Sequence, residues 1–149
     1  MIRKFHKSDA KECSRIMNAC QRIMPEFNSD QVEFLVSKYT PEYIEKEYPR
    51  YFALVFEDKG QIRGVGMLMD SEIRGLYIDP KFHCKGCGKS LLNALEDEAR
   101  AQGLDKVITK SYYGPEKFYE KMGYKKVKED AAGRGKISFP YVLMEKKLS

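Results

Sequence analysis

Residues 76–92 constrain the fold of this chain more than any other segment. They begin with an apolar strand pattern that ends at Ile78, and after a short turn they continue through a loop that contains Gly86 and Gly88. A helical pattern of leucines follows that loop. A loop in this place leaves unpaired backbone N–H groups at the positive end of the helix, where they can bind a phosphate group. We therefore expect the segment to hold a phosphorylated small molecule.

Length and composition predict one globular domain over residues 1–149. A chain of this length can bury its own core, and 42% hydrophobic with 33% charged residues is typical of a folded protein. No apolar run approaches the roughly 20 residues of a membrane helix, and the first residues lack the apolar segment of a signal peptide. We therefore expect a cytoplasmic protein whose four cysteines are reduced.

The net charge of +5 favours anionic ligands through long-range attraction. The basic residues are scattered among acidic ones and form no dense block, so the charge does not indicate a nucleic-acid-binding protein. We expect neither nucleic acid nor a membrane among the partners.

The first third of the chain predicts one strand and three helices. Ser8 and Asp9 can cap the first helix, whose apolar residues recur at helical spacing until Pro25 ends it. Ser29 and Asp30 can cap the second helix. The expected elements are a strand at 2–5, a helix after Asp9 up to Met24, a helix up to Tyr39, and a short helix at 41–48.

The remainder of the chain predicts six strands and two helices. Asp58 to Gln61 is a hairpin signal between two apolar runs, Gly103 is placed as a helix terminator, and Pro115 is tolerated in the first turn of a helix. The expected strands are 51–56, 62–69, 72–78, 107–109, 124–127 and 137–144; the expected helices are 88–102 and 115–122; and residues 129–136 are expected to form a polar loop.

The order of these elements, β-αα-βββ-α-β-α-ββ, predicts an α/β fold. We expect a mixed, mostly antiparallel sheet of about six or seven strands with helices on both faces. The helix at 88–102 should connect two parallel neighbours in the right-handed sense.

Three signatures in this order and spacing resemble the GNAT superfamily of acyl-CoA-dependent N-acyltransferases, and the resemblance covers nearly the whole chain. That family has a strand ending Leu-Tyr-Val-x-Pro, here LYIDP at 76–80. Its pyrophosphate loop follows Gln/Arg-x-x-Gly-x-Gly/Ala, here HCKGCG at 83–88. About thirty residues later it has Phe-Tyr-x-x-x-Gly-Phe, here FYEKMGY at 118–124. His83 stands where the family usually has Gln or Arg, and Tyr112 where many members have an Asn that contacts the pantetheine arm.

The resemblance implies acetyl-CoA as co-substrate and a place for it. The strands at 72–79 and 106–111 would separate at their ends, and Gly75 is a plausible bulge where the separation starts. The pantetheine arm would lie in the gap beside backbone of the first strand, and N–H groups of residues 85–90 would bind the pyrophosphate. The implied cofactor-binding residues are Leu76, Tyr77, Ile78, His83, Cys84, Lys85, Gly86, Cys87, Gly88, Lys89, Ser90 and Tyr112.

The resemblance also implies direct transfer of the acetyl group to a primary amine. Tyr119 would act as the general acid that protonates the departing CoA thiolate, and the N–H of Leu76 would stabilise the oxyanion. Glu72, at the start of the same strand, is our candidate general base; the alternative is a solvated glutamate at a turn. His6 is a further titratable candidate near a strand end. We expect no metal.

Other interpretations of the same residues stay open. Residues 88–90 read as the end of a P-loop, but the first glycine of that motif would fall at His83. Cys84 and Cys87 form a Cys-x-x-Cys pair before a helix, as in redox proteins, and with His83 they offer three of the four ligands of a zinc site. A non-catalytic acyl-CoA sensor would keep the loop without turnover. The acceptor is a small-molecule or protein amine whose identity the sequence does not determine. Exposed aromatic residues also leave open a homodimer.

Overall fold

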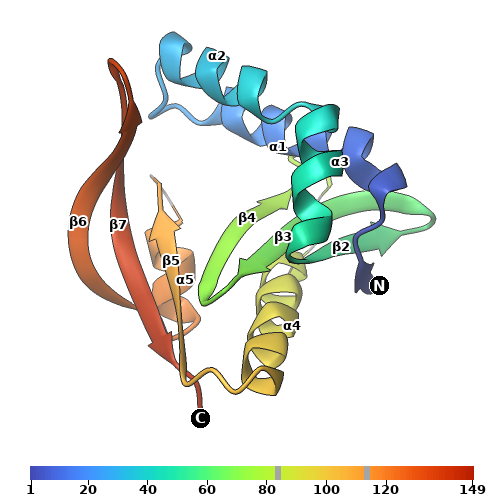
Figure 1. The fold of residues 1–149 in the computed structure, drawn as a ribbon, viewed down its shortest axis with the longest axis vertical. Helices are drawn as coiled ribbons and strands as arrows, with labels where there is room; N and C mark the ends of the chain where they lie inside the picture. Colours follow the sequence, from blue (N-terminus) through green and yellow to red (C-terminus); the bar gives the residue numbers. More distant parts are fainter. Residues whose placement is uncertain (83–84, 113–114) are drawn as a thin grey trace.

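Seven strands form one mixed sheet in the computed structural model, which describes residues 1–82, 85–112 and 115–149 (Figure 1). The strands are β1 (Ile2–Lys4), β2 (Phe52–Asp58), β3 (Gln61–Met69), β4 (Glu72–Ile78), β5 (Lys106–Ser111), β6 (Lys125–Arg134) and β7 (Ile137–Lys147). Their order across the sheet is β1-β2-β3-β4-β5-β7-β6. Among these strands β4 and β5 are the parallel pair, and the other neighbours are antiparallel.

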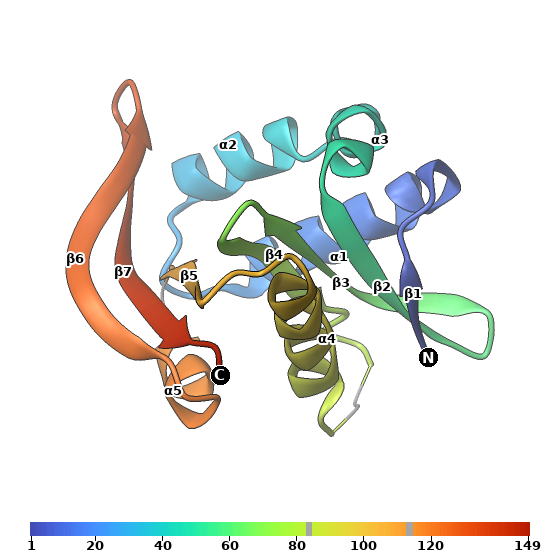
Figure 2. The ribbon, with the colours of Figure 1, turned by 60° about the horizontal axis from the view of Figure 1, so that its bottom comes forward.

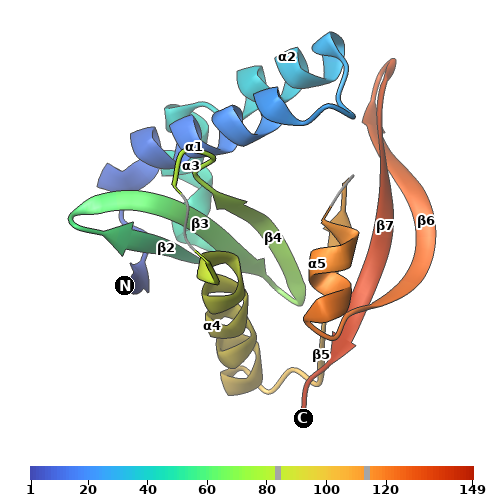
Figure 3. The ribbon, with the colours of Figure 1, turned by 180° about the vertical axis from the view of Figure 1, so that it is seen from behind.

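The helices cover both faces of this sheet, as the sequence predicted. They are α1 (Ala10–Ile23), α2 (Ser29–Lys38), α3 (Pro41–Glu47), α4 (Cys87–Ala101) and α5 (Glu116–Lys121), with 3-10 turns at Lys7–Asp9 and Tyr48–Arg50. Figure 3 shows α1, α2 and α3 on one side of the strands and α4 and α5 on the other. In Figure 2, α4 lies under the half of the sheet that contains β2, β3 and β4, and α5 lies beside the β5–β7 half.

Two apolar clusters hold these layers together. The cluster on the α4 side includes Leu91, Leu92 and Leu95, which are fully buried because they recur on one face of the helix. The cluster on the α1 side includes Ile16 and Met17, equally buried on a helix that packs against β3 and β4. The sheet thus has apolar side chains on both faces in its first half.

The order of elements is the predicted one, but one predicted loop is wrong. Residues 129–136 were expected to form a polar loop, and the structure instead continues β6 through Glu129 to Arg134, paired with β7 from Val142 to Ile137. Polar composition does not exclude this strand because β6 is at the sheet edge and its residues 125–130 are all exposed. The long neighbouring strand supplies hydrogen-bond partners that the sequence pattern does not reveal.

Candidate functional site

The central feature of the site is the early separation of β4 from β5. Their parallel pairing consists of Glu72 with Ile108 and Ile73 with Thr109. At the second pair the Thr109 hydroxyl donates a hydrogen bond to the Ile73 carbonyl at 3.0 Å. Beyond it β4 continues to Ile78 paired with β3 alone, among the strands described. The predicted separation is confirmed, and it leaves one edge of β4 without a strand partner.

A bulge in β4 begins directly after the last shared pair. The partners Met67–Arg74 and Val65–Tyr77 show one more residue on β4 than on β3 between them. Gly75 adopts φ +59°, and a Cβ there would lie 3.0 Å from the Tyr48 hydroxyl. The predicted bulge at Gly75 is therefore present, and the position favours glycine for both conformation and space.

The bulge sets the directions of the three side chains that follow it. Leu76 and Ile78 pack against the α4-side cluster, and Tyr77 packs against the α1-side cluster. The Tyr77 hydroxyl is buried near the Gln21 side-chain amide, and burial raises its pKa while the amide opposes part of that rise. The backbone of these residues, rather than their side chains, is what faces the gap beside β4.

The turn after β4 is fixed by the buried carboxylate of Asp79. It accepts hydrogen bonds from Arg15 at 3.1 Å, from Arg63 at 3.4 Å and from the Lys81 backbone N–H at 3.1 Å. Burial would raise the pKa of this carboxyl, but these donors together lower it below its usual value. Asp79 therefore anchors the start of the loop to both α1 and β3.

Among the described residues, no side chain caps the start of α4. Gly86 is the N-cap residue with φ +90°, and no described atom lies within 4 Å of where a Cβ would stand. The first turn contains no acidic residue, and Lys89 and Ser90 are exposed there. The Ser90 N–H already donates to the Gly86 carbonyl at 2.9 Å, so the N–H groups before it are the ones that suit an anion.

The cysteines of the chain are not all in the predicted redox state. Cys87 is 1% exposed and disulfide-bonded, which contradicts the expectation that all four cysteines are reduced. Cys13 and Cys20 are free thiols, as expected of residues on the apolar side of α1. The predicted contacts of His83 and Cys84 lie outside the described residues.

The three sequence signatures meet at Gly88. A Cβ on Gly88 would lie 3.5 Å from the Phe118 ring and 4.0 Å from the Ile78 side chain. The end of β4, the start of α4 and the start of α5 are therefore in contact, although 40 positions separate Ile78 from Phe118. This arrangement places the α4 N-terminus at the open end of β4.

Tyr119 lies in the same corner. Its side chain is 7% exposed, and its ring is 5.3 Å from the rings of both Phe118 and Tyr124. Burial raises the pKa of its hydroxyl, and the nearby Thr109 hydroxyl opposes part of the rise. Tyr119 thus stays a neutral proton donor at physiological pH, beside the pair where β4 and β5 separate.

Glu72 and Tyr112 lie on the α1 side of this separation. The Glu72 side chain is 16% exposed and forms an ion pair of 3.6 Å with Arg74. The Tyr112 ring is 5.5 Å from the Tyr141 ring, and burial raises the Tyr112 pKa to about 12. Because the charges of Glu72 and Arg74 both act on the pKa of Tyr112, the three groups lie near one another.

One buried polar residue at the site was missed by sequence reasoning. The Ser111 hydroxyl, 1% exposed, makes no hydrogen bond within the described part of the chain. Ser111 follows Val107 and Thr109 in alternation along β5. Buried polar groups normally find partners, so Ser111 is a candidate contact for a ligand in the gap.

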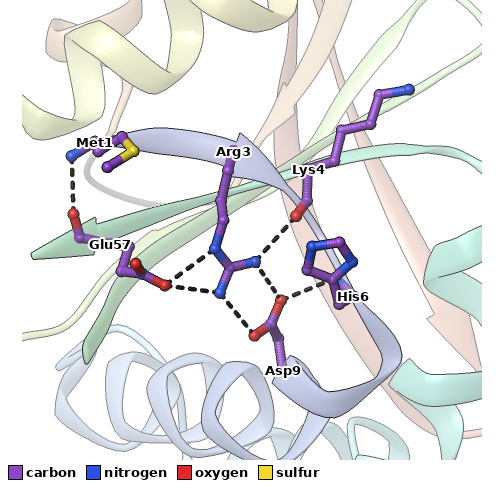
Figure 4. A network of polar contacts seen from close by, with 6 residues as sticks. All are labelled: Met1, Arg3, Lys4, His6, Asp9 and Glu57. Atoms are coloured by element: carbon purple, nitrogen blue, oxygen red, sulfur yellow. Dashed lines mark hydrogen bonds and ion pairs between the residues drawn. The ribbon is translucent and has the colours of Figure 1, made fainter. Parts of the chain in front are cut away.

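His6 is not part of the site. It is exposed, and its backbone N–H donates to the Asp9 carboxylate at 2.8 Å (Figure 4). Figure 4 shows this contact within a network in which the Arg3 guanidinium joins Asp9 and Glu57. The network fastens the N-terminal strand to β2, on the opposite side of β3 from the gap.

Most of the chain matches a family model in sequence, and nearly all of it resembles solved structures in fold. Residues 23–148 match a family model described as acetyltransferase (GNAT) domain. No curated protein matches significantly. In the part of the chain that the structure describes, no helix is both long and apolar enough to cross a membrane.

Solved structures with the same fold have low sequence identity to the chain. A GCN5-related N-acetyltransferase from Rhodopseudomonas palustris superposes with a TM-score of 0.92 at 20% identity, covering 99% of this chain and 95% of its own. The PaiA N-acetyltransferase of Thermoplasma acidophilum, in complex with coenzyme A, gives 0.78 at 20% identity over 99% and 98%. YncA of Salmonella typhimurium, a putative acetyltransferase with its cofactor acetyl-CoA, gives 0.70 at 19% identity over 100% and 94%.

Proposed function

Since the chain belongs to the GNAT acetyltransferase family, we propose that it transfers the acetyl group of acetyl-CoA to a primary amine. The observation that carries this proposal is the contact of Gly88 with both Ile78 and Phe118. This contact brings together the N-terminus of α4, the edge of β4 without a strand partner and the buried Tyr119. A carrier with a diphosphate and a thioester can use the first for its diphosphate, the second for its arm and the third for its sulfur.

The described residues fit acetyl-CoA as the co-substrate. The N–H groups of Gly86, Gly88 and Lys89 at the start of α4 would bind its pyrophosphate, and the free edge of β4 from Leu76 to Ile78 would pair with its pantetheine arm. The buried Ser111 hydroxyl would gain a hydrogen-bond partner on this arm. Several hydrogen bonds to charged groups, each worth roughly 1.5–3 kcal/mol, suffice for about micromolar affinity after the entropic cost.

Each proposed catalytic group has a distinct task. Glu72 takes a proton from the acceptor ammonium, so that the nitrogen lone pair can attack the thioester carbonyl and form the C–N bond. The Leu76 N–H donates to the oxygen as negative charge develops on it, an interaction typically worth about 10²–10³ in rate. As the C–S bond breaks, Tyr119 gives its hydroxyl proton to the thiolate. As the intermediate collapses, the nitrogen bonded to the acetyl carbon releases its second proton to solvent. The proton held by Glu72 returns through solvent to Tyr119, so the net reaction releases one proton.

A panel of primary amines, incubated with acetyl-CoA while free thiol is measured, tests this function. We expect acetyl-CoA to bind with a dissociation constant near the micromolar range, and at least one amine to release thiol and gain an acetyl group by mass spectrometry. Incubations without amine correct for hydrolysis. Absence of acetyl-CoA binding would overturn the proposal, and binding without transfer to any amine would favour the sensor interpretation instead.

A further inference from the structure

Arg74 occupies the acceptor side of the gap, directly before the bulge. Glu72 and Arg74 alternate with the core residue Ile73, so both lie on the α1 face of the sheet. Their partners on β3 are Met69 and Met67, and Met67 belongs to the α1-side cluster. The face on which Arg74 lies is thus the one opposite α4.

The Arg74 guanidinium is poorly satisfied by the protein. Its contacts in the described residues are an Nε–Oε2 distance of 3.6 Å to Glu72 and a weak Nη1 contact of 3.4 Å to the Met69 sulfur. A guanidinium has five N–H donors, and its side chain here is 39% exposed. Arg3, by comparison, donates to Glu57, Asp9 and the Lys4 carbonyl and is saturated (Figure 4). Arg74 therefore retains donors for a ligand.

Two tyrosines from separate elements lie near this guanidinium. The charge of Arg74 opposes the burial-driven rise in pKa of Tyr39, which follows α2, and of Tyr112, which follows β5. Partial burial among aromatic rings strengthens an ion pair with a planar carboxylate compared with a fully exposed site.

Two lysines lie beside aromatic residues near this guanidinium. Lys38 lies 5.3 Å above the Tyr39 ring, and Lys110 lies 5.3 Å above the Tyr141 ring. Glu72 supplies a carboxylate beside Arg74, and its exposed fraction of 16% leaves it less accessible than the arginine. The face therefore attracts an anion while keeping one carboxylate for an ammonium group.

The distance from Arg74 to the reacting carbonyl limits the size of the acceptor. Leu76, whose N–H we assign to the oxyanion, is two residues farther along β4, so at most about 7 Å separates the two Cα atoms across the bulge. A ligand that reaches both points has its anionic group only a few bonds from its reactive nitrogen.

We propose that the acceptor is an amine of the amino-acid class, whose carboxylate pairs with Arg74 while its amine faces Glu72 and the thioester. This proposal rests on the acetyltransferase function proposed above. It makes Arg74 a specificity-determining residue that acts on binding of the acceptor rather than on binding of acetyl-CoA.

Matched acceptors test this inference. Free amino acids and their C-terminal carboxamides, offered with acetyl-CoA, differ only in the group that Arg74 would bind. The ammonium group of a carboxamide has a lower pKa than that of the free amino acid, so a larger fraction of the carboxamide is present as neutral amine. This difference alone would favour turnover of the carboxamide, which is the opposite of the expected result. We expect kcat/KM for the best free acid to exceed that for its carboxamide by at least about tenfold. Arg74→Gln should abolish this preference mainly through KM, Arg74→Lys should restore part of it, and Arg100→Gln on the far side of α4 should leave it unchanged.

The possible failures separate the two proposals. Equal turnover of acids and carboxamides, or a preference that survives in Arg74→Gln, would overturn the role of Arg74 and leave the transferase intact. Absence of acetyl-CoA binding, measured by calorimetry on the same wild-type preparation, would overturn the transferase function itself. Loss of acetyl-CoA affinity in Arg74→Gln would also contradict a role confined to the acceptor.

Discussion

The Thr109 hydroxyl donates to the Ile73 carbonyl at 3.0 Å, at the last residue pair that joins β4 to β5. This side-chain bond adds a hydrogen bond to the Ile73 carbonyl at the point where the two strands separate. Because Thr109 is 2% exposed and also lies beside the Tyr119 hydroxyl, one threonine connects the strand separation to the proposed acid.

Thr109→Val should therefore destabilise the protein. Valine has nearly the same side-chain volume as threonine but no hydroxyl donor. Loss of the hydrogen bond to the Ile73 carbonyl should lower the free energy of unfolding by about 1–2 kcal/mol. Urea unfolding at neutral pH measures this difference. Ser111→Ala is the matched control, since it removes a buried hydroxyl of the same strand that makes no hydrogen bond among the described residues, and it should change stability by less than about 0.5 kcal/mol. Equal losses of unfolding free energy in the two variants would mean that the hydrogen bond from Thr109 to Ile73 does not stabilise the fold.

Gly75→Ala should destabilise the protein for two separate reasons. At φ +59° a Cβ is strained by about 1–2 kcal/mol, and it would also stand 3.0 Å from the buried Tyr48 hydroxyl. Gly60→Ala, at φ +79° with open space around the Cβ, carries the conformational cost alone. We expect the Gly75 variant to lose more free energy of unfolding than the Gly60 variant, and Tyr48→Phe to recover part of the excess in the double variant. Similar losses at the two glycines would mean that the contact with Tyr48 relaxes freely.

The low pKa of Asp79 predicts a specific acid sensitivity. Because the folded-state pKa is below the ordinary value, the carboxylate stabilises the fold above its unfolded pKa near 3.8, and this contribution disappears as the pH falls through the lower folded pKa. Asp79→Asn should lose about 1–3 kcal/mol at pH 7 and show a weaker decline in stability below pH 4. Unfolding curves from pH 3 to 7 test this. Asp97→Asn, at a 75% exposed side chain, is the control that should follow the wild type.

Local patterns predicted the parts of the site that depend on backbone. Gly75 inside an apolar strand indicated the bulge, and the spacing of Gly86 and Gly88 before a leucine pattern indicated the helix N-terminus. These features follow from conformational preferences of single residues, so a sequence reveals them without knowledge of neighbours.

The parts that depend on distant neighbours were not predictable. Residues 129–134 are polar and read as a loop, but β7 pairs with them. The apolar pattern alone indicated a strand at 107–109, and only the family resemblance extended it to Ser111, which the structure buries at the end of β5. Arg74 acts on the pKa of both Tyr39 and Tyr112 because residues after α2 and after β5 lie near β4, and no local pattern encodes that packing.

Tyr119→Phe should lower kcat by at least about tenfold while the dissociation constant of acetyl-CoA stays nearly unchanged. The phenyl ring keeps the contacts with Phe118 and Tyr124, so only the proton donor is lost. Burial raises the pKa of Tyr119 above its ordinary value of about 10, so the group stays protonated through neutral pH, and the alkaline limb of the wild-type kcat profile should begin above pH 10. Steady-state kinetics across pH, with binding measured by calorimetry, provide both readouts. Tyr51→Phe, at a partly buried ring beside Arg50, is the matched control and should behave as wild type. An unchanged kcat in Tyr119→Phe with a good acceptor would remove this hydroxyl from the mechanism and leave thiolate protonation to solvent.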